Sequence, residues 1–314
     1  MLTRSKFAFV IVGAGVLAVA AQAAELTGTL KKIEDSGSIS LGVRETSVPF
    51  NYQDDQQKYH GYSLDLCLKV VDQVRKTLKR PDIKVVMTPT TAATRIPLLA
   101  NGTTDMQCDG ASNTAERQKQ VAFSPTVFIT GNRLLAKKSS NVHKLDDMKG
   151  KPIVSMSGTT NIRQISELNA ERKLGMNVLT VTEHSEAFLM VETGRAVAYA
   201  QDDIHSAALI ASSKRPGDYM ISEESLSVDP YGLMLRRDDP PFKNVVDTAI
   251  TDLFKSGEIE QIYKKWFMSP IPPKNINLNW AISDYLRAAI AHPTDSPDPQ
   301  HYFDLVKKAG TATK

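Results

Sequence analysis

The stretch 151-KPIVSMSGTTNIRQISELNAERKLGMNVLTVTEHSEAFLMVETGRAVAYA-200 alternates short β-branched runs with longer amphipathic segments. The β-branched runs predict strands, and the segments between them have the apolar spacing of helices. Strands and helices that alternate along a chain are typical of an α/β fold with largely parallel sheets. The predicted strands are 151–156, 177–182 and 196–200, and the predicted helical segments are 157–173, which begins with a loop, and 185–195.

The chain before this stretch has the same alternation. Apolar residues at 64, 67, 68, 71 and 74 predict a helix over 61–80, and Asn-Gly ends a second helix at 94–102. The remaining N-terminal elements are predicted strands at 38–44, 83–88 and 104–108, followed by a long extended stretch within 121–138.

The C-terminal part is predicted to be helical. The segment 257–267 places Ile259, Ile262, Tyr263, Trp266 and Phe267 on one stripe, which is the ordinary spacing of a buried helix face. "SPIPPKN" ends this helix, and one more amphipathic segment follows from Leu278. The last 20 or so residues are rich in Pro, Asp and Lys, and we expect them to be mobile.

The N-terminus has the three parts of a secretory signal peptide. "MLTRSK" is positively charged, "FAFVIVGAGVLAVAA" is apolar but short for a bilayer, and "AQA" at 21–23 is a small-x-small cleavage site. We expect cleavage after Ala23 or Ala24; an uncleaved anchor is the alternative. The sequence therefore predicts a periplasmic protein.

The net charge gives no reason to expect a nucleic acid or an anionic lipid as a partner. The full chain of 314 residues carries +3, and removing Arg4 and Lys6 with residues 1–23 leaves +1. The mature chain is long enough for two domains of ordinary size. Its two cysteines, Cys67 and Cys108, can form one disulfide or stay free, and both alternatives remain open. Two cysteines without clustered histidines make a poor metal site, so we expect no metal.

Three arginines follow strands or open helices, where α/β proteins bind ligands. Arg44 ends a predicted strand, Arg95 opens a helix, and Arg117 ends the loop in "DMQCDGASNTAER" (105–117). An arginine in such a position can bind a carboxylate through two charge-assisted hydrogen bonds. A surface salt bridge is the alternative for each one taken alone.

Further polar groups follow the strands of the second half. In "SGTT" (157–160), glycine and hydroxyl residues lead into a helix, as in an anion site or a plain N-cap. Asp202 and Asp203 could hold an ammonium group or cap a helix, and an imidazolium at His184 could meet a second carboxylate. No catalytic motif is present, so these groups indicate a binding site rather than an enzyme.

These motifs together resemble the periplasmic solute-binding proteins of polar amino acid ABC transporters, over about residues 33–290. The family's D-x-x-x-x-G-x-[ST]-x-T-x-x-R pattern stands here as "DMQCDGASNTAER", beside "GYSLDLCLKVV", "SGTT", "DD" at 202–203, "YGLML" and "GEIEQIYKKWF". "TRIPLLANGTTDMQC", "ERQKQVAFS" and "SPIPPKNINLN" are most similar to the glutamate/aspartate-binding group.

The resemblance implies two α/β lobes that close on a ligand, joined by crossing strands near "TVFITGNRL" and "VDPYGLMLR". Lobe 1 would be discontinuous, with residues 24–132 and 233–277, and lobe 2 would span 133–232. Residues 278–314 would be a C-terminal extension. The resemblance also implies a monomer without a cofactor that binds L-glutamate or L-aspartate and delivers it to an inner-membrane ABC permease.

The resemblance also implies the role of each site residue. Arg117 would bind the α-carboxylate with Ser112, Thr159 and Thr160, and Gly110 and Asp202 would take the α-ammonium. Arg44, Arg95 and His184 would hold the side-chain carboxylate.

Two residues depart from the glutamate/aspartate group, and they open alternatives. Ala92 stands where that group tends to have serine, and Asp109, if it points inward, could favour an additional cationic group. Another polar amino acid or a dicarboxylate is therefore an alternative ligand. A dehydratase on the same scaffold, with Asp109 as general acid, and a sensory module are alternative functions.

Overall fold

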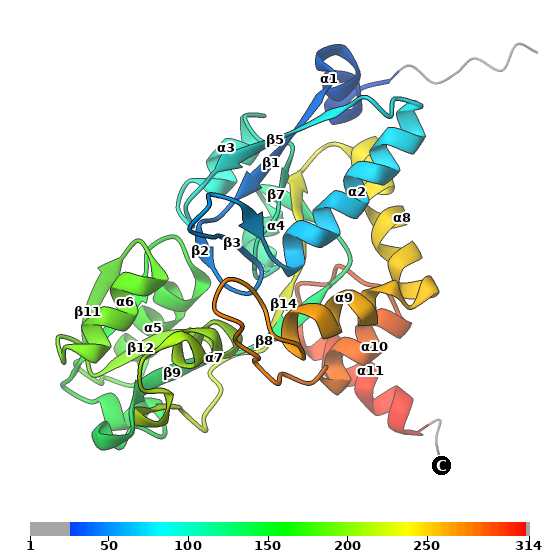
Figure 1. The fold of residues 1–314 in the computed structure, drawn as a ribbon. Coiled ribbons are helices and arrows are strands. Elements are labelled where there is room, and N and C mark those ends of the chain that lie inside the picture. Colours follow the sequence, from blue (N-terminus) through cyan, green and yellow to red (C-terminus); the bar gives the residue numbers. More distant parts are fainter. Residues whose placement is uncertain (1–25, 312–314) are drawn as a thin grey trace, which may run out of the picture.

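Two five-stranded sheets, each flanked by helices, form the two lobes of an α/β fold in a computed structural model (Figure 1). The structure describes residues 26–311, so the predicted signal peptide lies outside the described residues. None of the helices within 26–311 is long and apolar enough to cross a membrane.

The first lobe contains the sheet β5-β1-β6-β15-β7. Strand β1 runs parallel to β5 and β6, whereas β15 runs antiparallel to both of its neighbours. The strands are β1 (Ser38–Val43), β5 (Lys84–Pro89), β6 (Met106–Gln107), β7 (Val121–Phe123) and β15 (Met234–Arg236).

The second lobe contains the sheet β11-β10-β12-β9-β13, in which β10 is parallel to β11 and β12, and β9 is antiparallel to β12 and β13. The largely parallel arrangement predicted from the alternation is therefore confirmed, with one antiparallel strand per sheet. The strands are β9 (Asn132–Lys137), β10 (Pro152–Met156), β11 (Asn177–Val181), β12 (Ala198–Asp202) and β13 (Tyr219–Ile221).

A two-stranded ladder lies between the sheets. Strand β8 (Phe128–Thr130) pairs antiparallel with β14 (Asp229–Tyr231), and the chain passes from one lobe to the other at these strands (Figure 1). The antiparallel strands β9 and β15 each follow a crossing. The extended stretch expected over 121–138 is in fact three strands, β7, β8 and β9, in three different sheets. We propose the lobe boundaries near residues 132 and 232 on this basis.

The other elements cover these sheets or line the cleft between them. Helix α2 lies beside α8 over the first sheet, while α5, α6 and α7 pack around the second. The helices before residue 268 are α1 (Gly28–Ser36), α2 (Tyr62–Leu78), α3 (Arg95–Ala100), α4 (Ala115–Gln118), α5 (Thr160–Glu171), α6 (His184–Glu192), α7 (Asp203–Ser212), α8 (Pro240–Ser256) and α9 (Glu258–Phe267). A small sheet beside the cleft contains the short strands β2 (Thr46–Ser47), β3 (Asn51–Gln53) and β4 (Tyr59–His60). The 3-10 turns are Lys138–Ser140, Leu145–Met148 and Pro216–Asp218.

The largest apolar core belongs to lobe 1 and includes the predicted stripe of α9, all five residues of which are buried. In this core Cys67 of α2 and Cys108, just after β6, form a disulfide with a Cα–Cα distance of 6.0 Å. The structure thus decides between the two alternatives for the cysteines. The bridge ties the loop that begins at Asp109 to helix α2.

The C-terminal segment is helical and packed, in place of the mobile tail that its composition predicted. Helices α10 (Asp284–Ala291) and α11 (Pro299–Thr311) pack against each other and lie beside β8. Tyr302 is fully buried, and its hydroxyl group lies 2.7 Å from Thr126 Oγ1. Backbone carbonyls of the linker between these helices accept hydrogen bonds from Thr126 N and from the side chains of Asn113 and Gln118. The tail thereby contacts the Arg117 loop and the crossing.

Candidate ligand site

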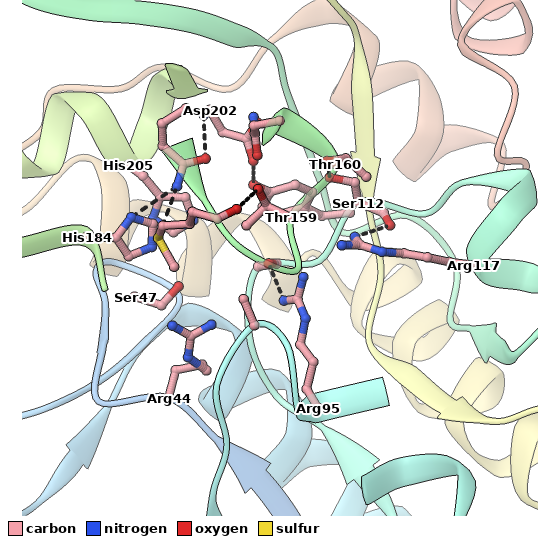
Figure 2. A pocket seen from close by; sticks show the side chains of 16 residues that line it. Arg44, Ser47, Arg95, Ser112, Arg117, Thr159, Thr160, His184, Asp202 and His205 are labelled. Carbon is pink, nitrogen blue, oxygen red and sulfur yellow. Dashed lines mark hydrogen bonds between the residues drawn. The ribbon is translucent and has the colours of Figure 1, made fainter. Parts of the chain in front are cut away.

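A pocket lies between the two lobes, at the carboxyl ends of strands from both sheets (Figure 2). The space between its walls is ≈ 340 Å³ with the open mouth included. All nine residues expected from the sequence line it: Arg44, Arg95, Gly110, Ser112, Arg117, Thr159, Thr160, His184 and Asp202. Their individual roles stay predictions. The lining also includes Ser47, Ala92, Met156, Asn161, Gln201, His205 and Tyr231.

Arg117 is a buried cation that no carboxylate approaches within 4.0 Å in the described part of the chain. Its Nη1 donates to Ser112 O at 2.9 Å, and its Nη2 donates across the cleft to Gly158 O at 3.3 Å. Burial, with the like charge of Arg95, lowers the pKa of Arg117 to about 9. A buried positive charge without an anionic partner is costly, which makes this position well suited to an anionic ligand group.

Arg44 points into the other end of the pocket from lobe 1, and Arg95 lies between Arg44 and Arg117 (Figure 2). The Nε groups of both are buried without a hydrogen-bond partner among residues 26–311. Burial lowers the pKa of Arg44. Since a buried N–H donor without an acceptor costs free energy, these two groups also favour a ligand that supplies acceptor oxygens.

Asp109 does not line the pocket. Its side chain is 1% exposed, and its Oδ2 accepts from Arg95 Nη1 at 2.6 Å and lies 4.0 Å from Arg44 Nη1. Asp109 was expected to favour a cationic ligand group only if it pointed inward, and this condition is not met, because its carboxylate faces the two arginines. The same geometry removes Asp109 as the general acid of a dehydratase.

His184 is held in one tautomer by its neighbours. Gln201 Nε2 donates to His184 Nδ1 at 3.0 Å, which leaves Nε2–H as the ring's own donor. Burial lowers the pKa of His184 well below its ordinary value, with the charge of the stacked His205 ring adding to the effect. His184 is therefore a neutral donor here and not the imidazolium that the sequence suggested.

Asp202 lies across the pocket from Arg117 (Figure 2). Asn161 Nδ2 donates to its Oδ1 at 2.7 Å, and the Tyr231 hydroxyl donates to its Oδ2. Burial raises the pKa of Asp202. A cationic ligand group at this position would stabilise the ionised carboxylate. Asp203, the alternative acid, instead accepts from Thr130 Oγ1 at 2.6 Å and is not part of the pocket lining.

The turn around Gly110 and the start of α5 need particular residues. A Cβ atom on Gly110 would lie 2.7 Å from Tyr231 Cε2 and 3.2 Å from His205 Nε2, so a larger residue would collide with the opposite wall. Gly158 has a φ of +74°, which suits glycine, and leads into Thr159, whose hydroxyl caps α5 by accepting from Ile162 N. The N-terminus of this 12-residue helix opens onto the pocket.

Five contacts join the lobes around the pocket. The Ser112 and Thr160 hydroxyls lie 3.2 Å apart, and Arg117 reaches Gly158 as described. Three further contacts flank the Arg44 end. Glu183 Oε2 accepts from Thr46 and lies 3.5 Å from Arg44 Nη2, and His205 Nδ1 donates to Val48 O at 2.9 Å.

Sequence reasoning missed Gln201, His205 and Tyr231 as lining residues. His205 lies one helical turn after Asp202, so its helix position was a usable signal once Asp202 had been chosen. Gln201 and Tyr231 approach the pocket only because β12 and β14 end there. No group of three or more potential metal ligands occurs in the described residues, and none of these findings requires a metal.

Two α/β lobes, a two-stranded crossing and a charged pocket between the lobes define a two-lobed solute-binding protein. Residues 39–269 match the model of the bacterial extracellular solute-binding proteins, family 3, and the chain belongs to this family. A solved structure of an ancestral arginine-binding protein bound to arginine has the same fold, with a TM-score of 0.67 and 28% identity over 74% of this chain and 98% of that one.

Two curated relatives cover almost the whole chain. The L-glutamate/L-aspartate-binding protein of Pseudomonas aeruginosa is 47% identical over 91% of this chain and 95% of its own. The glutamate/aspartate import solute-binding protein of Escherichia coli is 44% identical over 89% of this chain and 93% of its own. The resemblance to the glutamate/aspartate group is therefore confirmed, and both relatives are named as binding proteins.

Proposed function

We propose that this protein captures an acidic amino acid, L-glutamate or L-aspartate, between its lobes and delivers it to an inner-membrane ABC permease. The observation that carries the proposal is the set of three buried arginines, Arg44, Arg95 and Arg117, in one pocket with Asp202. Burying two carboxylates requires paired positive charge and full hydrogen bonding, and this pocket supplies both. The names of the two curated relatives support the same ligands.

The geometry supports one orientation of the ligand. Arg117 receives the α-carboxylate, because it has no carboxylate partner of its own, with Ser112, Thr160 and the capped start of α5 completing the anion site. Asp202 and Gly110 O receive the α-ammonium. At the other end Arg44, Arg95 and His184 Nε2–H donate to the side-chain carboxylate. Thr159 contributes mainly by capping α5, since its hydroxyl accepts from Ile162 N and donates to Met156 O at 2.7 Å.

The biological setting is part of the proposal. The protein is exported by its N-terminal signal peptide, cleaved after Ala23 or Ala24, and works in the periplasm as a monomer without a cofactor. Lobe closure brings both lobes into the arrangement that a permease recognises. A glutamine-like ligand is the nearest alternative; it would leave the arginine and histidine donors facing a neutral amide, which offers them one acceptor oxygen in place of two.

Calorimetric titration of ligand-stripped mature protein with L-glutamate, L-aspartate and L-glutamine tests the proposal. We expect tight binding of at least one acid and much weaker binding of the amide. Succinate, which lacks the ammonium group, is the matched control for Asp202 and should bind poorly. Preferential binding of glutamine, or binding of none of the amino acids, would refute the proposed ligand class.

A further inference from the structure

A second set of charges lies around the arginines at the side-chain end of the pocket. Asp109 stands behind them, with its Oδ2 at 2.6 Å from Arg95 Nη1 and 4.0 Å from Arg44 Nη1. Glu183 approaches Arg44 from the other lobe, at 3.5 Å from Nη2. Neither carboxylate lines the pocket, so neither is placed to contact a ligand directly.

The two ends of the pocket differ in whether their arginines are in contact with a carboxylate. At the side-chain end the two positive charges of Arg44 and Arg95 are matched by the two negative charges of Asp109 and Glu183. Arg117 has no carboxylate within 4.0 Å in the described chain, and Asp202 faces it only from across the pocket, so the charge of Arg117 is not paired by direct contact. The two carboxylates also differ in burial: the Asp109 side chain is 1% exposed and the Glu183 side chain is 33% exposed.

A charge-compensated subsite attracts a carboxylate less strongly than two free arginines would. It still presents hydrogen-bond donors to the ligand from the side chains of Arg44, Arg95 and His184, whose ring keeps its proton on Nε2. Discrimination between an acid and its amide would then depend on the number of acceptor oxygens more than on net charge.

We propose that Asp109 and Glu183 are specificity-determining residues, which reduce the preference of this site for an acidic side chain over the corresponding amide. The inference rests on the proposed function, since it assumes that the ligand's side chain lies at Arg44 and Arg95. It assigns the two carboxylates an electrostatic role through the arginines, without contact to the ligand.

The experiment compares Asp109→Asn with wild type by calorimetric titration of L-glutamate and L-glutamine. Asparagine can still accept the hydrogen bond from Arg95, so the change removes mainly the charge. The measured quantity is the ratio of the glutamine Kd to the glutamate Kd. We take the charge of Asp109 and that of the ligand's side-chain carboxylate to be about 10 Å apart. At an effective dielectric constant of about 20, their repulsion corresponds to about a tenfold change or more in the glutamate Kd, so the ratio should rise by about that factor in Asp109→Asn.

Glu183→Gln is the second variant, and it lies on a partly exposed residue, so it should fold normally. It should raise the same ratio by a smaller factor, because solvent screens its charge more strongly. Asp105→Asn is the matched control: Asp105 is equally buried in lobe 1 and pairs with Lys32 Nζ at 2.8 Å, away from the pocket. Its ratio should stay at the wild-type value.

The possible results separate the inference from the proposed function. Wild-type binding of an acid combined with an unchanged ratio in both site variants overturns the inference alone. Equal weakening of both ligands also overturns it, since this would show that the carboxylates only position the arginines. If wild type binds no acidic amino acid, the proposed function fails, and the inference fails with it.

Discussion

Replacing Arg117 by methionine separates ligand binding from folding more clearly than any other single change. The guanidinium is buried, donates to Ser112 O and Gly158 O, and has no carboxylate within 4.0 Å among residues 26–311. A ligand carboxylate at its free edge would gain two charge-assisted hydrogen bonds, each of about 1.5–3 kcal/mol. The loss of both, about 3–6 kcal/mol, corresponds to a fall in affinity of about 10²- to 10⁴-fold.

The stability of the ligand-free protein should respond in the opposite way. Burial lowers the pKa of Arg117 to about 9, so the charged group is held in the fold at a cost in free energy. Methionine has a similar length and no charge, and replacing a buried charge with an apolar side chain of similar volume is often neutral or stabilising. We therefore expect Arg117→Met to have a melting temperature equal to or above that of wild type without ligand.

The assay is calorimetric titration with L-glutamate, together with thermal unfolding with and without ligand. Arg117→Lys keeps the charge but loses the two-pronged geometry, and it should lie between wild type and Arg117→Met. Arg163→Met is the control, because Arg163 is on α5 of the other lobe and its side chain is 52% exposed. An affinity of Arg117→Met within threefold of wild type, or one equal to that of Arg117→Lys, would refute the assignment of Arg117 to the α-carboxylate.

Three further changes test other parts of the structure. Gly110→Ala places a methyl group 2.7 Å from Tyr231 Cε2. Ligand affinity should therefore fall by at least tenfold in calorimetric titration, while the circular dichroism spectrum stays native. An affinity near that of wild type would contradict the close approach of Gly110 and Tyr231. Burial lowers the pKa of His205 from 6.5 to about 4, so its neutral form contributes stability on the order of 3 kcal/mol that is present above pH 6.5 and lost as the pH falls toward 4. Denaturant unfolding at pH 7.5 and pH 5 should show about 2 kcal/mol of this loss in wild type, since pH 5 lies about 1.5 pH units below 6.5, and a smaller loss in His205→Gln. Equal losses in the two proteins would contradict it. Tyr302→Phe removes the hydroxyl that donates to Ser296 O at 2.7 Å and lies 2.7 Å from Thr126 Oγ1. The free energy of unfolding should fall by about 1–2 kcal/mol in denaturant titration, and an unchanged value would mean that these two hydrogen bonds together contribute nothing.

The fold could be predicted from the sequence because the strands and helices of the two lobes follow local patterns. The helix predicted over 61–80 is α2, and the strand predicted over 151–156 is β10. The stretch 121–138 shows where local patterns end. Its residues are extended in all three strands, but which sheet each strand joins depends on pairing with β15, β14 and β12 far along the chain.

The candidate site could be predicted from the sequence because ligand-binding residues in α/β folds lie just after strands, and a strand end can be located in a sequence. What the sequence could not give was the direction of the side chains that follow. Asp109 directly precedes Gly110, yet it faces the arginines from behind while Gly110 faces Tyr231. The protonation of His184 was likewise hidden, because it depends on burial and on Gln201, which a sequence pattern does not report.

The C-terminal segment illustrates a different limit. Its composition is that of a mobile tail, and helix α11 gains most of its order from tertiary contacts rather than from its own propensity. Tyr302 packs with Ile129 of β8 and Ala289 of α10 in one apolar cluster. Such contacts with a strand more than 150 residues earlier leave no periodic signal in the sequence.

The distribution of charge between the lobes gives a physical reason for coupling between ligand binding and lobe closure. Lobe 1 supplies Arg44, Arg95 and Arg117, whose mutual repulsion contributes to lowering the pKa of Arg44 and Arg117. Lobe 2 supplies Asp202, the start of α5 and neutral His184. Either lobe alone would leave these groups in water, where each is hydrated at little cost. In the proposed lobe closure that water is removed, so an anionic ligand with an ammonium group would stabilise the closed form more than the open one, which is the differential affinity that closure requires.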